Sequence, residues 1–329
     1  MKVLVLDRAA VEGLLDFDGL IDAVAQGMVD LSIGSVSMPS RVGANVAPHD
    51  GLLLAMSAYV PSSATLATKL VTVFPRNAGA GLPSHHAVIA VFDEATGAPI
   101  ALMDGEHITA ARTAACSALA TRLLARPDAS TMAVLGTGVQ ARAHALAIPR
   151  VRDIQKVRIA GRDPEKAAAL AYDLTKQLDM SVTPAASFQD ACRDASIVCT
   201  TTHSLEPVLR WQWLSPGAHV NCVGLNPQGR ELDDETVAGS LVVVESRQAV
   251  MTATPPPNDL LSAIRCGLVP EDHIHAEVGE LVSGSRPGRT SPDQITLYRS
   301  VGVAVQDAVA ARLVLDRARE QGVGVTVDL

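Results

Sequence analysis

The stretch that decides the fold is Thr131-Met-Ala-Val-Leu-Gly-Thr-Gly-Val-Gln-Ala141. Its first five residues are mostly apolar and partly β-branched, which is typical of a buried parallel strand. Residues 136–141 fit the pattern G-x-G-x-x-G/A, and an alanine-rich helical run follows without a break. The first glycine permits a tight turn, the second lets the backbone approach a pyrophosphate, and the small last residue lets the helix pack closely on its strand. A strand before the glycines and a helix after them predict a dinucleotide-binding turn.

The chain beyond residue 130 alternates between expected strands and helices. A helix is expected at 164–178, with a proline at its start. Further strands are expected at 157–160, near 182, and at 197–199, 219–223 and 241–244. This alternation predicts an α/β fold with a parallel, right-handed sheet, a Rossmann-type NAD(P)-binding domain over 126–299.

The first 125 residues follow a less regular pattern. Helices are expected at 8–32 and 108–125, short strands within 36–61, a strand at 68–74, and a hairpin from 87–92 to 99–103. Arg126-Pro-Asp128 ends the second helix, so we place the domain boundary there. A last helix, 301–319, is expected to pack back on the first domain. That α+β domain is then discontinuous and consists of 1–125 and 300–329.

Composition excludes several classes of protein. The 329 residues are 48% hydrophobic with a net charge of −8 at pH 7, sufficient for about two domains with sizeable cores. Acidic and basic residues are interspersed, and no basic block favours a nucleic-acid partner. No uninterrupted apolar run is long enough to span a bilayer, and the opening residues become charged too early for a signal peptide. We therefore expect a cytoplasmic protein without a membrane role.

The cysteines and histidines give no metal-binding pattern. Five cysteines are scattered through apolar or alanine-rich segments without a C-x-x-C pair, which is typical of reduced core residues. Close histidine pairs occur at 85/86 and 273/275, and a convergent third ligand is not evident. We expect surface or site-lining roles for these histidines and no metal.

The end of the second Rossmann strand indicates which dinucleotide is preferred. An NAD site usually carries an acidic residue there, about 20 residues after the glycines, to bind the ribose 2′-hydroxyl. This chain has Gly161 at that position and Arg162 beside it. A missing carboxylate and an adjacent guanidinium suit a 2′-phosphate, so we predict that NADP(H) is preferred and NAD(H) is possible. Asp163 is interpreted as the N-cap of the helix that begins at Pro164.

Two further strand ends are expected to line the cofactor crevice, because ligands of an open α/β sheet lie at the carboxyl ends of its strands. One is hydroxyl-rich, Thr200-Thr-Thr-His-Ser204, and contributes Thr201. The other, Val223-Gly-Leu-Asn226, contributes Val223 and Gly224. Ordinary strand-and-turn chemistry remains the alternative for any single residue among them.

The first domain carries cations in unusual places. Lys69, one of five lysines, lies inside the apolar strand, and Arg112 lies inside the alanine-rich helix. Arg41 follows the turn Met38-Pro-Ser40, and for it a surface position is an equal alternative. A cation in an apolar segment is costly unless it is paired or faces a ligand. Together the three would form a carboxylate-binding site, in which arginine supplies a planar fork of donors.

With these features in place, the chain resembles the ornithine cyclodeaminase/mu-crystallin family over nearly its full length. The combination of motifs is more specific than any single one. The matching segments are Met38-Pro-Ser-Arg41, Thr68-Lys-Leu-Val71, Gly81-Leu-Pro-Ser84, Phe92-Asp-Glu-Ala-Thr-Gly97, Thr109-Ala-Ala-Arg-Thr-Ala-Ala115, the glycine turn, Arg230-Glu-Leu-Asp233, and Ser300-Val-Gly302 with Asp307.

The resemblance implies a Rossmann domain joined to a discontinuous substrate-binding and dimerisation domain, usually in a homodimer. It implies that Arg41, Lys69 and Arg112 hold the substrate carboxylate, with Lys69 and Arg112 as the catalytic candidates. It also implies a set of cofactor contacts. These residues are Ser84, Thr113, Gly136, Thr137, Gly138, Val139, Gln140 and Ser300.

Two positions depart from the pattern of true ornithine cyclodeaminases. Those enzymes place a glutamate where this chain has Leu54, and an aspartate after the glycine of the fifth strand, where it has Leu225. Loss of both acids removes the groups expected to bind a distal amine and shuttle its proton. Arg162 also indicates an external NADP(H) reductant. The pattern is closer to the ketimine reductases of the family.

The sequence therefore predicts an NAD(P)H-dependent reductase of small cyclic imino acids. Expected substrates are Δ1-pyrroline-2-carboxylate or Δ1-piperideine-2-carboxylate, giving L-proline or L-pipecolate. Lys69, His85, His86 and a bound water stay open as the proton donor, and Asp307 is equally a helix-packing residue. One alternative is an ornithine cyclodeaminase-type enzyme or amino-acid dehydrogenase. The other is a non-catalytic, NADP(H)-dependent small-molecule-binding protein.

Overall fold

The computed structural model describes residues 1–328, which divide into two compact units. Unit 1 combines residues 1–112 with the segment from 302 onward, and unit 2 comprises residues 113–301. Unit 1 is thus discontinuous in sequence. We expected the divisions at 125/126 and 299/300, whereas the structure divides the chain within a long helix and after the last strand of unit 2.

The helix α3 (Gly105–Leu124) explains why the first division falls where it does. Its first residues bond within unit 1, since Thr109 accepts from Lys69 and Arg112 donates to Asp307. Its later residues bond within unit 2, where Ser117 contacts the ring of His144. The break at Pro127 ends the helix without marking the division between the units.

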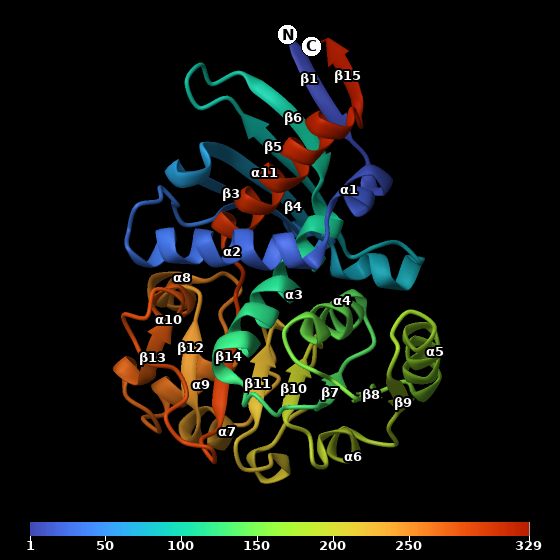
Figure 1. The fold of residues 1–329 in the computed structure, drawn as a ribbon, viewed down its shortest axis with the longest axis vertical. Helices are drawn as coiled ribbons and strands as arrows, with labels where there is room; N and C mark the ends of the chain where they lie inside the picture. Colours follow the sequence, from blue (N-terminus) through green and yellow to red (C-terminus); the bar gives the residue numbers. More distant parts are fainter. Residues whose placement is uncertain (329) are drawn as a thin grey trace. The chain divides into compact units, whose positions relative to one another are not determined.

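Unit 1 is a seven-stranded sheet with one face covered by helices. The strand order is β15-β1-β6-β5-β4-β3-β2. Helices α2 and α11 lie side by side across one face of this sheet (Figure 1). The elements are β1 (Lys2–Leu6), α1 (Arg8–Leu14), α2 (Phe17–Ser32), β2 (Val42–Val46), β3 (Gly51–Val60), β4 (Thr65–Val73), β5 (His85–Phe92), β6 (Pro99–Asp104), α11 (Ala304–Gln321) and β15 (Val325–Asp328).

The helical character expected over 8–32 is confirmed, but the structure divides this segment into two helices, α1 and α2. Asp16 adopts extended backbone angles and its side chain accepts from the amide of Gly19, which starts a second helix. Asp7 caps α1 in the same way. The hairpin predicted from 87–92 to 99–103 is confirmed as the antiparallel pair β5/β6. The strands β1 and β15 were not expected, since each is short and gains its partners from the other end of the chain.

Unit 2 is a Rossmann-type parallel sheet, as predicted, so the chain has an α/β fold. Its strand order is β13-β12-β14-β11-β10-β7-β8-β9, and β14 enters between two earlier strands, which the sequence did not indicate. The strands are β7 (Thr131–Leu135), β8 (Lys156–Ala160), β9 (Ser181–Pro184), β10 (Ile197–Thr200), β11 (His219–Cys222), β12 (Leu241–Val244), β13 (Ile274–Glu277) and β14 (Thr296–Arg299). The helices are the C-terminal part of α3 with α4 (Val139–Ala147), α5 (Pro164–Thr175), α6 (Phe188–Cys192), α7 (Asp234–Gly239), α8 (Arg247–Thr252), α9 (Asn258–Arg265) and α10 (Val278–Val282).

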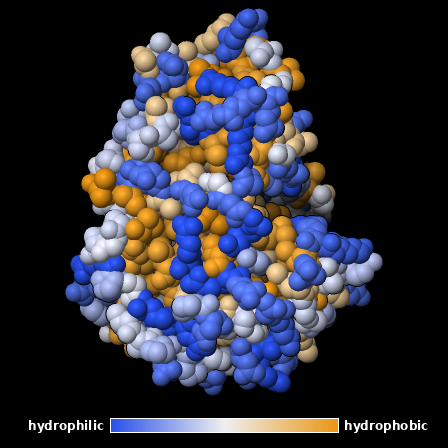
Figure 2. Space-filling view, viewed as in Figure 1, coloured by the Kyte–Doolittle hydropathy of each residue, from blue (hydrophilic) through white to orange (hydrophobic). Residues whose placement is uncertain are grey.

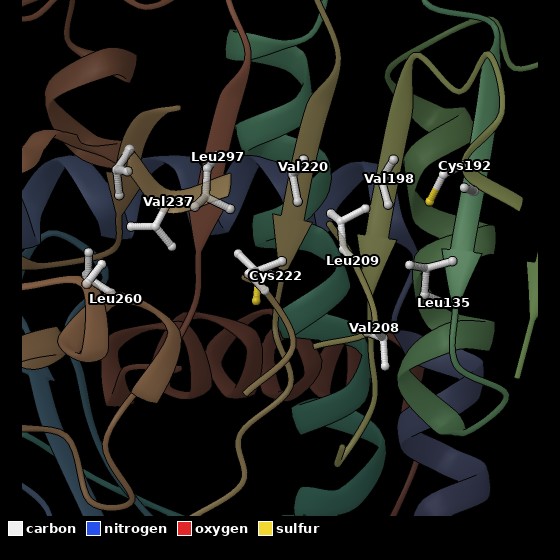
Figure 3. Close-up of a cluster of buried hydrophobic side chains, with 14 of the residues drawn as sticks. Leu135, Cys192, Val198, Val208, Leu209, Val220, Cys222, Val237, Leu260 and Leu297 are labelled. Carbon is white, nitrogen blue, oxygen red and sulfur yellow. The ribbon is translucent and has the colours of Figure 1, made fainter. Parts of the chain in front are cut away.

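The core of unit 2 is built from aliphatic side chains on the parallel strands. Leu135, Val198, Val220 and Leu297 project from four neighbouring strands into one cluster (Figure 3). Each buried aliphatic side chain stabilises the fold by about 1.5–3 kcal/mol. This cluster holds the carboxyl ends of the strands in fixed register.

Four of the five cysteines are core residues, and Cys266 is exposed, contrary to the expectation of a wholly buried set. Burial raises the pKa of Cys192 and Cys199 to about 12. Within residues 1–328, no three side chains of the metal-binding types converge on a common point. Among the same residues, no helix is both long enough and apolar enough to cross a bilayer.

Candidate active site

The predicted dinucleotide turn connects β7 to α4. Gly136 has a φ of +131°, which side chains rarely adopt, and a Cβ there would collide with the Thr201 hydroxyl. Helix α4 begins at Val139 after the N-cap Gly138, which has no side chain to bond the first amides of the helix. Those N–H groups are the donors that phosphate accepts at a helix N-terminus.

The turn lies at the point where the strand order reverses. Strand β7 has β8 on one side and β10 on the other, the position at which open α/β sheets bind ligands. Thr201, directly after β10, bonds the carbonyl of Leu135 through its amide at 2.9 Å and its hydroxyl at 3.0 Å. The Oε1 atom of Gln140 is buried without a hydrogen-bond partner among the described residues. A Rossmann dinucleotide fits this site.

The end of β8 carries the residues expected to choose the dinucleotide. A Cβ on Gly161 would lie 2.6 Å from the methyl group of Thr137, so any side chain there would require Thr137 to move. Arg162 is exposed beside it. Asp163 accepts from the amides of Glu165 and Lys166, which confirms its interpretation as a helix N-cap.

The remaining expected cofactor residues have different surroundings. Gly224 leaves no room for a side chain between Thr202 and Glu231, and Val223 bonds Thr200 through its amide. Ser300 is buried, and its hydroxyl donates to Glu245 at 2.6 Å. Thr113 is buried on α3 in unit 2. Ser84 belongs to unit 1, where its hydroxyl contacts the ring of His85.

A buried network that the sequence analysis missed joins three strand ends of unit 2. We call Glu231, Asp259 and Arg299 the carboxyl-end network. Glu231 accepts from the hydroxyls of Thr200 and Thr202 at 2.7 and 2.6 Å and from the Gly224 amide at 2.7 Å. Burial raises the pKa of Glu231 despite these donors.

The other two members of this network form an ion pair. Asp259 contacts Arg299 at 2.7 Å, and both side chains are 1% exposed. Asp259 also accepts from the amides of Glu231 and Leu232, and Arg299 donates to the carbonyl of Gly224 at 2.9 Å. The charged residues within Thr296–Arg299 and Arg230-Glu-Leu-Asp233 were the sequence signals that could have indicated this network.

A second buried cluster, in unit 1, contains two of the predicted cations. We call Lys69, Arg112 and Asp307 the cation cluster. The Nζ atom of Lys69 lies 2.8 Å from Asp307 Oδ2, and both side chains are 2% exposed. The Nε atom of Arg112 donates to Asp307 Oδ1 at 2.9 Å, and its Nη1 donates to Gln306 at 2.6 Å. Strand β4, helix α3 and helix α11 thus each supply one charged group.

Arg41 approaches the same cluster. Its Nη2 donates to the carbonyl of Gly302 at 2.8 Å. Gly302 has a φ of +68°, and a Cβ there would lie 2.7 Å from Nη1 of Arg112. The charge of Arg41 also contributes to the lowered pKa of Lys69. The structure therefore brings the three predicted cations together, and Arg41 is partly buried rather than a surface residue.

Burial and neighbouring charge set the ionisation of this cluster. Burial lowers the pKa of Lys69 to about 8, with Asp307 opposing the shift and Arg112 adding to it. Burial opposes the charge of Asp307, but Arg112 and Lys69 hold its pKa below the ordinary value. At neutral pH the cluster therefore consists of two cations and one carboxylate. Asp307, which the sequence left undecided, is its centre.

The histidines considered as proton donors lie elsewhere in unit 1. His85 and His86 are both exposed at the start of β5. The ring of His86 contacts Glu106 at 2.9 Å, and that of His85 contacts Ser84. Glu106 and Ser84 both lie outside the cation cluster.

A Rossmann unit joined to a unit with a buried cation cluster defines the class of nicotinamide-dependent oxidoreductases. The chain belongs to the ornithine cyclodeaminase/mu-crystallin family, whose model matches residues 1–322. This confirms the family predicted from the motifs.

Relatives in this family reduce imino acids. The Δ1-pyrroline-2-carboxylate reductase of Bacillus cereus ATCC 14579 is 35% identical over 331 residues, covering 99% of this chain and 100% of the relative. The ketimine reductase mu-crystallin of Mus musculus is 39% identical over 284 residues, 86% of each chain. The solved structure of Thermococcus litoralis Δ1-pyrroline-2-carboxylate reductase in complex with NADH and L-proline is 38% identical with a TM-score of 0.95. That match covers 99% of this chain and 100% of the other.

Proposed function

We propose that this protein is an NAD(P)H-dependent reductase of small cyclic imino acids. Δ1-Pyrroline-2-carboxylate is the first substrate, giving L-proline, and Δ1-piperideine-2-carboxylate, giving L-pipecolate, is the second. The observation that carries the proposal is the buried pairing of Lys69 and Arg112 on one carboxylate, Asp307. A Δ1-pyrroline-2-carboxylate reductase that is 35% identical and a ketimine reductase that is 39% identical to this chain support the same reaction.

The charge of the cation cluster suits an imino acid. Two cations on one carboxylate leave one positive charge in excess, and a buried excess charge is costly without a counter-ion. A substrate carboxylate supplies that counter-ion, and Arg112 still has donors beyond those bonded to Asp307 and Gln306. Arg41 provides further positive charge nearby. We propose that these three side chains anchor and orient the substrate carboxylate.

Two leucines support a substrate without a distal amine. Leu54 is buried in β3, and Leu225 packs on the apolar core of unit 2. Neither can balance an ammonium charge, which a cyclodeaminase substrate carries. This favours a ring imine over ornithine.

The glycine turn, Thr201 and Gly224 would hold the dinucleotide, through backbone amides at the pyrophosphate and close backbone approach. The dinucleotide supplies the hydride. We propose that NADP(H) is preferred over NAD(H), because Gly161 supplies no carboxylate for the ribose 2′-hydroxyl and Arg162 is exposed beside it. The relative from T. litoralis was solved with NADH, so both cofactors have to be compared.

We also propose a homodimer that buries the face of the unit 1 sheet opposite to helices α2 and α11. Val42, Leu70 and Val88 share one cross-strand row on that face and are 67%, 40% and 43% exposed. The face that carries α2 and α11 mixes hydrophilic and hydrophobic residues (Figure 2). A contiguous apolar sheet face marks a protein interface. Light scattering should show a dimer for the wild type and a monomer for Leu70→Asp; a monomeric wild type would contradict the proposal.

We propose the cytoplasm as the compartment. The cysteines of the described chain form no disulfide, which is typical of a reducing compartment. Cell fractionation would test this, and secretion of the protein would overturn it.

The reaction is tested by following NADPH and NADH absorbance with each imino acid, for wild type beside Lys69→Ala and Arg112→Ala. We expect rapid oxidation by the wild type and its loss in both variants. Oxidation that requires an oxo acid and ammonia would indicate an amino-acid dehydrogenase. Binding of NADPH without turnover of any imino acid would indicate a binding protein, and either result would overturn the proposal.

A further inference from the structure

Reduction of an imine needs a proton as well as a hydride. We propose that Lys69 donates this proton to the imine nitrogen, and that Asp307 is the positioning residue that holds the ammonium of Lys69 in place and in its charged form. This inference rests on the proposed function and identifies the acid of that reaction.

The side chain of Lys69 has the donors that this role requires. An ammonium has three N–H bonds. Thr109 Oγ1 accepts one of them at 3.3 Å, and Asp307 Oδ2 lies 2.8 Å from Nζ as its ion-pair partner. Among the described residues no further partner of Nζ is found, so an N–H remains for a ligand. The nitrogen and the carboxylate of an α-imino acid are attached to the same carbon, so a group that binds the carboxylate also lies close to the nitrogen.

Asp307 is held so that it cannot turn away from Lys69. Its two oxygens have different cationic partners, Oδ2 with Lys69 and Oδ1 with Arg112. Arg112 is itself fixed by Gln306, the preceding residue of α11. The carboxylate therefore holds both proposed substrate anchors, Lys69 and Arg112, and is not itself required to touch the substrate.

The proton balance of the step is simple. The hydride adds to the imine carbon, and the electron pair of the C=N bond moves to nitrogen and accepts a proton from Nζ of Lys69. The C=N bond becomes CH–NH, the nicotinamide is oxidised by two electrons, and Lys69 is left as a neutral amine. It regains its proton from solvent after the product leaves. Asp307 stays a carboxylate throughout.

The neighbours of Lys69 make its charge depend on Asp307. The cross-strand partners on β3 and β5 are the apolar Met56 and Ile89. The charged groups that act on Lys69 are Asp307 from α11, Arg112 from α3, and Arg41. Asp307 raises the pKa of Lys69, whereas burial and both arginines lower it. Removing the charge of Asp307 therefore leaves only influences that lower this pKa.

The test compares Asp307→Asn with a control on the same helix, Asp316→Asn. Both wild-type carboxylates are ion-paired, Asp307 with Lys69 and Asp316 with Arg312. In the wild type, kcat/KM should fall above about pH 8, where Lys69 loses its proton. Asp307→Asn should move this falling limb down by about one pH unit or more, because an adjacent opposite charge shifts a pKa by that amount. Asp316→Asn should leave the limb in place. An unmoved limb in Asp307→Asn would overturn the positioning role.

A second variant tests the proton-donor role of Lys69 separately from its role in binding the substrate carboxylate. Lys69→Arg keeps the positive charge but replaces the amine with a group that does not release its proton at these pH values. We expect KM for the imino acid to change little and kcat to fall about 10²- to 10⁴-fold, the usual contribution of a general acid. Retained kcat would show that a water donates the proton and would overturn the assignment to Lys69.

A third readout does not depend on turnover. The chain has five lysines, so carbon-13 labelling at Cε gives five signals, and the one lost in Lys69→Arg identifies Lys69. That signal should titrate near pH 8 in the wild type and lower in Asp307→Asn. If it does so while no imino acid is reduced, the proposed function and the donor role fail and the coupling to Asp307 stands. If it titrates at the same pH in both proteins, the coupling fails.

Discussion

The two units each bury a cluster of charged side chains, and the clusters differ in what balances them. In unit 2, the carboxyl-end network has two carboxylates and one guanidinium, and backbone amides of Gly224, Glu231 and Leu232 donate to its carboxylates. In unit 1, the cation cluster has two cations and one carboxylate. The excess charge of the carboxyl-end network is negative, and backbone amides donate hydrogen bonds to it. The excess charge of the cation cluster is positive.

This difference separates an architectural role from a ligand-binding role. A carboxylate that accepts several backbone N–H bonds ties the chain segments that donate them together and so rigidifies its surroundings. The carboxyl-end network therefore fixes the strand ends at which the dinucleotide turn lies. An uncompensated buried cation is unfavourable unless a ligand neutralises it. Among the described residues the cation cluster has one carboxylate for two cations, an arrangement that favours the binding of an anion.

The largest effect should come from breaking the ion pair of unit 2. Arg299→Leu leaves Asp259 buried without its partner, so the free energy of unfolding should fall by about 3–5 kcal/mol. Denaturant unfolding would measure the loss. Arg312→Leu, which breaks the partly exposed pair with Asp316, is the control and should cost less than about 1 kcal/mol. If both variants lose the same free energy of unfolding, the carboxyl-end network does not have the proposed architectural role.

The next effect tests the cation cluster. Arg112→Ala should lower kcat/KM for the imino acid by about 10²- to 10³-fold, since a bidentate anchor of the carboxylate is lost. The dissociation constant of NADPH, measured by fluorescence, should stay within about threefold of the wild type. Glu231→Gln should have the opposite effects: its main defect should be weaker NADPH binding, and kcat/KM for the imino acid at saturating NADPH should change less. Loss of both affinities in Arg112→Ala would contradict the division of roles.

A smaller effect should appear on acidification, through two neutral histidines buried in unit 2. Burial lowers the pKa of His144 to about 4 and of His219 to about 3, from 6.5. Between pH 6.5 and about 4 the unfolded chain then binds more protons than the folded chain, so stability present at neutral pH is lost as the pH falls. From pH 6.5 to pH 5 the loss should be about 2 kcal/mol per histidine.

Unfolding in denaturant at each pH would measure this slope. His219→Gln should reduce it by about half. The exposed His49 of unit 1 gives a control, His49→Gln, with an unchanged slope. A slope that does not respond to His219→Gln would show that other groups control the acid response.

The smallest effect concerns the dinucleotide. Arg162→Ala should raise KM for NADPH about three- to tenfold and leave KM for NADH unchanged, because an exposed guanidinium contributes modestly to binding a 2′-phosphate. Steady-state kinetics with both cofactors would measure the ratio. A wild type that prefers NADH, or a variant whose ratio is unaltered, would contradict the proposed NADP(H) preference.

Local patterns in the sequence predicted the parts of the fold that depend on neighbouring residues. The strand, glycine turn and helix at 131–148, the cap at Asp163 and the β5/β6 hairpin all follow from contacts within a few residues. Lys69 and Arg112 were predicted as buried cations because their segments are apolar. These features need no knowledge of the rest of the chain.

Features made by distant residues were not predictable in this way. Asp307 meets Arg112 across 195 positions of sequence, and nothing in α11 alone distinguishes that carboxylate from a surface one. The insertion of β14 between β11 and β12 and the pairing of β1 with β15 are likewise set by tertiary packing. Glu231 and Asp259 were missed because their partners lie far away in the sequence: Glu231 bonds the Thr200 hydroxyl across 31 positions, and Asp259 pairs with Arg299.

The central claim is that the positive excess of the cation cluster exists to bind the carboxylate of a ring substrate. The most direct measurement is calorimetric titration of the NADP+-loaded protein with pyrrole-2-carboxylate and with pyrrole, which share a planar ring and differ in the carboxylate. The account predicts that pyrrole-2-carboxylate binds, that pyrrole does not, and that Arg112→Ala abolishes the difference. Equal binding of the two rings, or of neither by a protein that holds NADP+, would contradict it.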